Sequence, residues 1–192
     1  MTRPEDVLEF WLDECKPEDW FRADPDFDLK ITEIFRPAWE RAMEGSLSLW
    51  LTYPSGALAY IILTDQFSRN MFRGTSKAFA SDPLALAVSK SSIAKGWDQR
   101  IDEPARHFFY MPLMHSETLV DQDRCVRLMA TRMTDNENSI LHAKAHREVI
   151  RLYGRFPTRN EALGRSSTTK EIHYLENGSY GAVVRELSSV TA

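Results

Sequence analysis

Four polar residues in the first half of the chain have the types and spacing of an anion-binding site. Asp65 and Arg69 lie four residues apart, on one face of an expected helix, and Asn70 and Arg73 follow before a glycine turn. Arginine can hold a carboxylate or phosphate through two hydrogen bonds, and asparagine can both donate and accept. We therefore expect Arg69, Asn70 and Arg73 to bind an anion, with Asp65 as a catalytic residue that orients an arginine or a histidine. The alternative is an intrahelical Asp65–Arg69 ion pair followed by a helix-ending turn.

A histidine and a glutamate near the middle of the chain have the types of a proton-transfer pair. His115 and Glu117 precede an expected helix for which Ser116 is a candidate cap. Histidine titrates near neutral pH and can exchange a proton within hydrogen-bond distance, so we expect His115 and Glu117 to be catalytic. The same types could belong to a metal site, but no second set of ligands is apparent. The structural alternative is a capped helix whose His115 and Glu117 tie a loop to a neighbouring helix.

Arginines are concentrated in one segment of the second half of the chain, although the whole chain is acidic. Arg155, Arg159 and Arg165, with Asn160 among them, precede a helix expected to begin at Thr168. The N–H groups at a helix N-terminus and a cluster of arginines both favour an anion. We expect Arg159, Asn160 and Arg165 to bind a ligand. An irregular turn, in which the arginines bind backbone carbonyls, is the equal alternative.

Other common catalytic patterns are weak or missing. His142 and His146 lie four residues apart, but the zinc-protease pattern needs a glutamate after the first histidine, where Ala143 stands. A histidine pair in packing or on the surface is therefore favoured. Cys15 and Cys125 have no adjacent histidine, and the sequence has no glycine-rich nucleotide loop, nucleophile elbow or EF-hand. We expect neither a metal nor a cofactor.

Helices must position these residues, because the apolar periodicity is helical along nearly the whole chain. Asp24 followed by Pro25 is a typical cap and first helical position. The sequence contains no alternation long enough for a sheet. We predict an all-α fold of about eight helices in antiparallel pairs, a TPR-like arrangement or helical bundle. The helices are expected from Pro4, from Asp24 to Met43, after Pro54, from Asp82 to Gly96, after Pro104, from Ser116 to Met133, from Ser139 to Tyr153 and from Thr168.

Size and composition are those of a packed globular protein. The 192 residues fit a single domain over residues 1–192, and 43% of them are hydrophobic. The net charge of -4 gives no basic excess for a nucleic-acid backbone, although local arginines could bind a small anion. The N-terminus has no apolar signal core, and the longest apolar stretch, Ala57 to Leu63, is far shorter than the roughly 20 residues of a bilayer span. We expect a cytoplasmic protein without a nucleic-acid or membrane partner.

Several short motifs are distinctive when they are taken together and in order. They are VLEFW, LTDQFSRNMFRGT, AFASD, PLMHSE, VDQ, HREVI, YGRFPTRN and LGRSST, and they extend from about Val7 to about Leu175. With these motifs the chain resembles the DUF924 family of bacterial proteins. The resemblance implies an all-helical, TPR-like fold of antiparallel helix pairs. It implies no reaction, because the family has no settled activity.

The chain departs from the family pattern at four positions. Thr64 and Ser68 stand where the family usually has leucine and proline. Met114 stands where glutamate is usual, which weakens an acid–base or metal role at that position. His142 stands where tyrosine is common, which argues against a metal site formed with His146. The residues that fit the pattern are His115, Glu117, Asp65, Arg69, Asn70, Arg73, His146, Arg155, Arg159, Asn160 and Arg165.

Two functions follow from these patterns. The first is an enzyme or binding protein for a small anionic molecule, whose polar side chains converge on one cavity. The second is a TPR-like protein-interaction module, in which the polar motifs are struts between helices and a concave helical face binds a protein. Burial distinguishes the two. Struts should be separately buried and paired, whereas the residues of a site should be clustered and incompletely paired.

Overall fold

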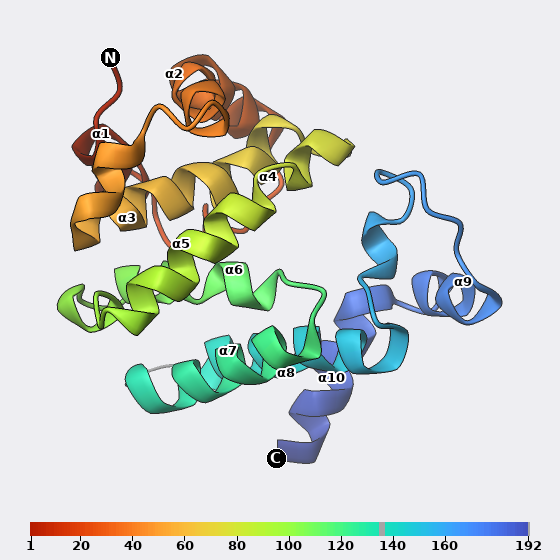
Figure 1. Ribbon diagram of the computed structural model, residues 1–192. Coiled ribbons are helices and arrows are strands. Elements are labelled where there is room, and N and C mark those ends of the chain that lie inside the picture. Colours follow the sequence, from red (N-terminus) through yellow and green to blue (C-terminus); the bar gives the residue numbers. More distant parts are fainter. Residues whose placement is uncertain (135–136, 192) are drawn as a thin grey trace. The chain divides into compact units, whose positions relative to one another are not determined.

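The computed structural model describes residues 1–134 and 137–191, and these residues form helices, turns and loops without a strand. The predicted all-α class is confirmed. Figure 1 shows helices that pack against one another, joined by connections that range from short turns to the long loop over residues 154–168. The chain divides into two compact units, unit 1 (Met1–Pro112) and unit 2 (Leu113–Ala192), and each is described by itself. The expectation of a single domain over residues 1–192 stays a prediction.

Unit 1 contains two segments of π-helix that continue an α-helix without a break. Its helices are α1 (Pro4–Leu8) with the π-helical η1 (Glu9–Glu14), α2 (Pro25–Met43), α3 (Pro54–Ile61) with the π-helical η3 (Ile62–Phe67), α4 (Ser68–Met71) and α5 (Asp82–Ala94). Short 3₁₀ turns lie at Ser48–Thr52, Ser76–Phe79, Asp98–Arg100 and Ala105–Phe109. The short α6 (Met111–Met114) spans the boundary between the two units in the sequence.

The long helix α2 begins and ends where the sequence predicts. The Asp24 carboxylate accepts hydrogen bonds from the backbone N–H groups of Asp26 and Phe27, and Pro25 occupies the first helical position. These contacts satisfy N–H groups that have no partner within the helix. After Met43 the chain leaves the helix through Gly45, whose φ of 76° is in the left-handed region.

The helix that carries the first polar cluster runs continuously through α3, η3 and α4. In its π-helical part each N–H group reaches a carbonyl five residues back, so this turn contains one extra residue. The hydroxyl of Thr64 donates to the Tyr60 carbonyl at 2.7 Å, and that of Ser68 donates to the Thr64 carbonyl at 2.9 Å. The hydroxyls of Thr64 and Ser68 therefore add hydrogen bonds to this part of the helix.

Aromatic rings form the core of unit 1. The ring of Trp11 lies 5.2 Å from that of Phe67 and 6.0 Å from that of Phe108, measured between centroids. The ring of Phe35, from α2, lies 4.6 Å from that of Phe67. All four residues are almost completely buried, and edge-to-face contacts of this kind add to the free energy of burying the rings. The cluster fixes η3, and with it Asp65, against α2 and η1.

Unit 2 is built on α8, which packs against α7 and against α10. Its helices are α7 (Leu119–Arg132), α8 (Glu137–Tyr153), α9 (Thr169–Glu176) and α10 (Ser179–Thr191). Gly154 follows α8 with a φ of 69°, and Thr168 and Glu171 form the predicted capping box of α9. The core of the unit contains Ala145, Val149, Ile150, Phe156, Tyr174 and Val183.

One predicted helix start in unit 2 is wrong, and one helix end was not predicted. α7 begins at Leu119, because Thr118 rather than Ser116 occupies the cap position. The Ser116 hydroxyl instead donates to the Asp121 carboxylate at 2.8 Å. The helix that begins at Thr168 had no predicted end. It ends at Glu176, and Gly178, with a φ of 90°, turns the chain into the separate helix α10. None of the described helices combines the length and hydrophobicity needed to cross a bilayer.

Candidate functional site

Arg69 is held between two carboxylates in unit 1. Its guanidinium lies 3.4 Å from the Asp65 carboxylate in η3 and 3.0 Å from the Asp82 carboxylate at the start of α5. Burial alone would lower the pKa of Arg69, but the charges of Asp65 and Asp82 outweigh it and raise this pKa. The predicted Asp65–Arg69 ion pair therefore forms, and Asp82 is a second carboxylate bound to the same guanidinium.

Asn70 and Arg73 share one partner, Asp28, which the sequence did not single out. The Asp28 carboxylate accepts from Arg73 Nε at 2.6 Å, from Arg73 Nη2 at 2.9 Å and from Asn70 Nδ2 at 2.8 Å. These hydrogen bonds raise the pKa of Arg73. Asp28 lies in the first turns of α2, where an acidic residue is ordinary, so its type and position gave no signal.

Glu117 holds together the arginine-rich segment of unit 2. Its carboxylate accepts from the two terminal nitrogens of Arg165, at 2.8 and 3.0 Å, and from the backbone N–H of Phe156 at 2.8 Å. Burial would raise the pKa of Glu117, but the hydrogen bonds from Arg165 and Phe156 lower it. Within the described residues Glu117 makes no hydrogen bond to His115, the partner that the sequence suggested.

His115 lies beside Arg159 and His146 in unit 2. Arg159 Nη2 donates to the His115 carbonyl at 3.0 Å, and the Arg159 guanidinium lies 4.4 Å from the centroid of the Phe156 ring. The rings of His115 and His146 are 6.1 Å apart between centroids. The chain thus brings together a cation, an aromatic ring and two imidazoles from three segments that are far apart in the sequence.

The hydrogen bonds around His146 indicate its tautomer. Its Nδ1 lies 2.9 Å from the His142 carbonyl, which can only accept, so this nitrogen carries the proton. The Tyr180 hydroxyl lies 2.7 Å from His142 Nδ1 and 3.1 Å from His146 Nδ1. Burial first, and then the charges of His115 and Arg159, lower the pKa of His146 to about 3. At neutral pH this imidazole is therefore uncharged, with the lone pair on Nε2.

Two buried polar atoms in the arginine-rich segment have no hydrogen-bond partner in the described part of the chain. They are Asn160 Oδ1 and Arg165 Nε. The other end of the Asn160 amide donates to the Ser167 hydroxyl at 3.0 Å. Unsatisfied buried atoms are uncommon in folded proteins, and in the described part of unit 2 the only other one is Gln122 Oε1 in α7.

Comparisons with known proteins found one matching family and one similar solved structure. Residues 7–179 match the profile of a family described as "Bacterial protein of unknown function (DUF924)". The chain belongs to the DUF924 family. A solved structure from Agrobacterium tumefaciens, titled "Structure of Protein of Unknown Function ATU0120", is 38% identical, with 91% of this chain and 97% of that chain covered and a TM-score of 0.86. No curated protein matches the sequence significantly.

The DUF924 match contains all nine predicted site residues and extends slightly beyond Leu175, where the motifs end. These residues fall into two groups. Asp65, Arg69, Asn70 and Arg73 lie in unit 1, and His115, Glu117, Arg159, Asn160 and Arg165 lie in unit 2. Their catalytic and ligand-binding roles stay predictions. In the described residues no group of three or more histidine, cysteine, aspartate or glutamate side chains is placed to hold a metal ion.

Proposed function

We propose that this DUF924 chain is a helical, TPR-like protein-interaction module whose polar motifs hold its helices in place. One observation carries the proposal. Three arginines expected to bind an anion, Arg69, Arg73 and Arg165, each bind a carboxylate of their own unit. A phosphate or carboxylate ligand would have to displace that carboxylate and leave its charge unpaired in a partly buried position, which costs free energy.

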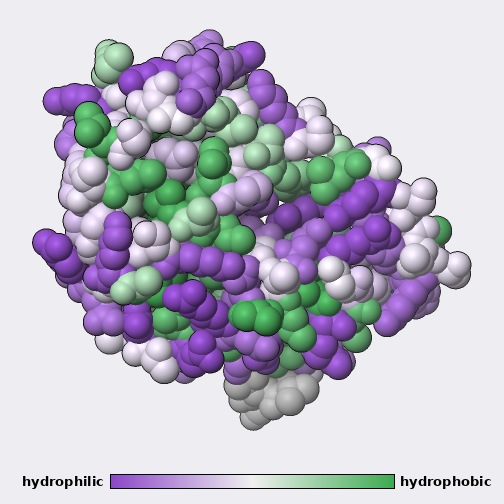
Figure 2. Space-filling view, in the orientation of Figure 1, coloured by the Kyte–Doolittle hydropathy of each residue, from purple (hydrophilic) through white to green (hydrophobic). Residues whose placement is uncertain are grey.

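The surface of unit 1 supports the same proposal. Leu49 is 78% exposed and Phe21 is 64% exposed. Figure 2 shows a hydrophobic area over the part of unit 1 where α1 and α3 lie in Figure 1. Single exposed apolar residues are common, but a continuous apolar area is typical of a surface that binds another protein.

A thermal-unfolding titration tests whether the arginines are struts. Phosphate, sulfate and citrate are added separately to the wild type, to Arg73→Ala and to the control Arg36→Ala. Arg36 is an exposed arginine that pairs with Glu40 within α2. A strut predicts that Arg73→Ala lowers the melting temperature equally with and without each anion, while Arg36→Ala changes it little. A saturable stabilisation that Arg36→Ala keeps and Arg73→Ala loses would contradict the proposal.

A second function, binding of a small anionic molecule by unit 2, is favoured by one separate observation. His146 is uncharged, and its Nε2 has no hydrogen-bond partner among the residues described, while Arg159 lies close enough to lower its pKa. A neutral imidazole can accept a hydrogen bond at Nε2 from a hydroxyl of the ligand, while the guanidinium beside it binds the anionic group of the same ligand. In this version His146 and Arg159 bind the ligand, His115 is the acid–base residue, and Glu117 positions the segment through Arg165.

Imidazole NMR tests this second function. The ring nitrogens of His146 are followed by long-range ¹H–¹⁵N correlations while acetate or phosphate is titrated. An anion site predicts a saturable shift of Nε2 that is absent in Arg159→Gln and unchanged in His173→Gln, a variant of an exposed histidine in α9. Shifts that follow only the ionic strength, with no saturation, would exclude an anion site at His146.

A further inference from the structure

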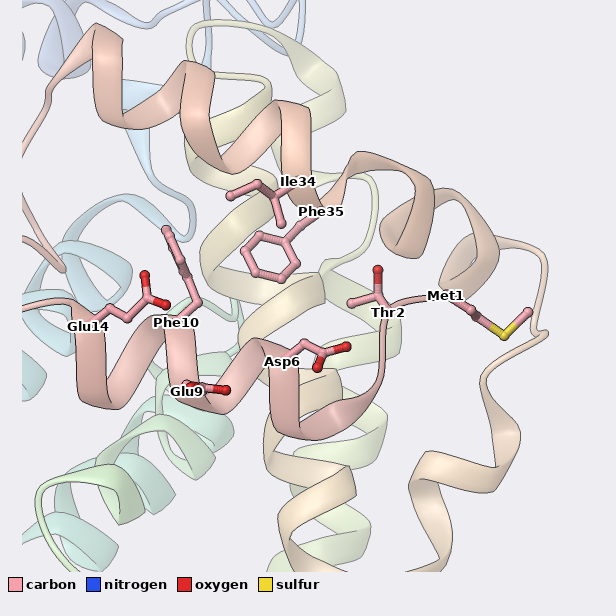
Figure 3. Close-up of a pocket in the computed structure, with 8 residues that line it drawn as sticks. All are labelled: Met1, Thr2, Asp6, Glu9, Phe10, Glu14, Ile34 and Phe35. Carbon is pink, nitrogen blue, oxygen red and sulfur yellow. The ribbon is translucent and has the colours of Figure 1, made fainter.

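A hollow of about 410 Å³ lies in unit 1 between α1–η1 and α2. Figure 3 shows Asp6, Glu9 and Glu14 along one helical wall and Ile34 and Phe35 along the other. Its lining consists of Met1, Thr2, Asp6, Glu9, Phe10, Glu14, Ile34 and Phe35. Carboxylates and apolar side chains thus line the same space, and none of these residues belongs to the predicted site.

The floor of the hollow is apolar and well packed. The rings of Phe10 and Phe35 meet edge to face, with their centroids 5.1 Å apart, and both side chains are almost completely buried. Ile34, beside them on α2, is 45% exposed. An apolar side chain placed over Ile34 would remove hydrophobic surface from water, which stabilises a complex by about 25 cal/mol per Å².

The α1–η1 wall of the hollow has an acidic excess, because it carries five carboxylates against Arg3, Lys30 and the terminal amine. Asp6 pairs with Arg3 at 2.7 Å, and Glu14 lies 3.8 Å from the amine of Lys30. The terminal amine also lies near enough to Asp6 to lower its pKa, after the larger effect of Arg3. Glu9 makes no salt bridge in the described part of the chain, although Arg3 lies near enough for the charge of Glu9 to raise the pKa of Arg3. The hollow therefore has a carboxylate available for a positive group.

The same helix carries two more acidic residues of this kind. Glu5 and Asp13 lie four residues before and after Glu9 and, within the described residues, have no ion-pair partner. Two of the lining residues already contact a cation from outside the lining, since the amine of Lys30 lies 4.9 Å from the centroid of the Phe10 ring and 3.8 Å from Glu14. The complementary chemistry is an apolar side chain next to a lysine or arginine.

We propose that this hollow docks a basic amphipathic helical segment of a partner protein. An apolar side chain of the segment lies against Ile34 and Phe35, and a lysine or arginine one turn away pairs with Glu9. A helical segment presents an apolar and a basic side chain one turn apart on the same face, which is the pair of anchors that Ile34 and Glu9 require. The inference rests on the proposed interaction function and names the class of partner.

The test uses two synthetic helical peptides of one design, a leucine–lysine peptide and its leucine–glutamate counterpart. Each is titrated into the ¹⁵N-labelled full chain, and its affinity is measured by fluorescence polarisation. We expect saturable shifts for amides of α1, η1 and α2 with the leucine–lysine peptide alone. Glu9→Lys should weaken its binding about ten-fold or more, because like charges then face each other. The exposed Glu18→Lys is the charge control.

A second pair of variants tests the apolar floor. Ile34→Ser should weaken the binding of the peptide several-fold, whereas Val120→Ser, which alters an even more exposed apolar residue in α7 of unit 2, should leave it unchanged. Equal weakening by Glu9→Lys and Glu18→Lys would overturn the proposal, because it indicates attraction to net charge. Failure of the peptide to bind, binding on another face, or self-association through these amides would also overturn it. The proposed interaction function fails separately, through the anion titration of Arg73→Ala.

Discussion

Arg73 and Asp28, 45 residues apart in the sequence, are joined by two hydrogen bonds of 2.6 and 2.9 Å. The pair fixes the turn after α4 against the N-terminal part of α2. Asn70 donates to the same carboxylate, so three donors depend on one acidic side chain. The first polar motif of the sequence is therefore completed by a residue from a different helix.

Loss of this carboxylate should cost more than loss of Arg73. Asp28→Ala leaves the buried Asn70 amide unsatisfied, and we expect it to lower the free energy of unfolding by about 2 kcal/mol. Arg73→Ala should cost about 1 kcal/mol or less, because half of its side chain is in water. Urea unfolding of both single variants and of the double variant measures the coupling. The neighbouring Asp26→Ala is the control, and strict additivity would show that Asp28 and Arg73 do not interact.

Gly56, in the first turn of α3, should tolerate no larger side chain. A Cβ atom there would lie 2.3 Å from the Trp50 carbonyl oxygen and 2.8 Å from the Tyr53 ring, far below contact distance. We expect Gly56→Ala to cost more than about 2 kcal/mol in chemical denaturation. In Gly45→Ala the added Cβ atom meets no other atom, but alanine is strained at the positive φ of this position. We expect this variant to cost about 1 kcal/mol. The reverse order of the two variants would mean that the backbone of α3 shifts easily.

Acid should destabilise the protein partly through His146. Its pKa is lower in the folded chain, about 3, than the ordinary value of 6.5, so the fold favours the neutral form. Above pH 6.5 the imidazole is neutral in both states and this contribution is complete. As the pH falls from 6.5 toward 3, only the unfolded chain takes up the proton, and stability falls by at most about 1.4 kcal/mol per pH unit.

The contribution of His146 is measured as a difference between stability curves. His146→Gln should flatten the fall in the free energy of unfolding between pH 6.5 and pH 4, relative to the wild type. His173→Gln, which changes an exposed histidine, should leave the slope as it is. An unchanged slope in His146→Gln would mean that His146 takes up its proton in the folded chain as readily as in the unfolded one.

Cys125 should be unreactive until the protein unfolds. The residue is completely buried, and burial raises the pKa of its thiol to about 12, so almost no thiolate is present near pH 8. The variant Cys15→Ala isolates Cys125, and we expect its reaction with a disulfide reagent to follow the rate of unfolding. Cys125→Ala isolates the partly exposed Cys15, whose pKa is raised to about 11 by burial first. Rapid labelling of Cys125 in the native protein would contradict this burial.

Local signals predicted the ends of helices better than their middles. Asp24 with Pro25, and Thr168 with Glu171, are short-range capping patterns, and both helices begin where these residues lie. The π-helical η3 has no such signal. It lies in an almost wholly buried helix that has buried residues on all of its faces, so no single apolar stripe marks the change in helix type. Thr118 occupies the cap position of α7 through its extended backbone and makes no capping hydrogen bond, since the hydroxyls of both Ser116 and Thr118 donate to the Asp121 carboxylate.

The candidate site residues were visible as residue types, but their partners were not. Asp28 and Glu171 are ordinary acidic residues near helix starts. Asp28 nevertheless binds Arg73, and Glu171 accepts hydrogen bonds from both Nε and Nη2 of Arg155. The contact between Tyr180 and His142 joins positions 38 residues apart and depends on α10, which the sequence did not separate from α9. Partners at such separations follow from tertiary packing, which a single sequence does not encode in its periodicity.

The π-helical turn at Ile62–Phe67 determines the direction in which Arg69 and Asn70 leave the helix. Removal of one residue from this turn would restore an uninterrupted α-helix and rotate every later side chain by about 100°. Arg69 would then turn away from Asp82, and Asn70 away from Asp28. A single inserted codon in an ancestral straight helix would be enough to bring these side chains to their present carboxylates, without any substitution among them.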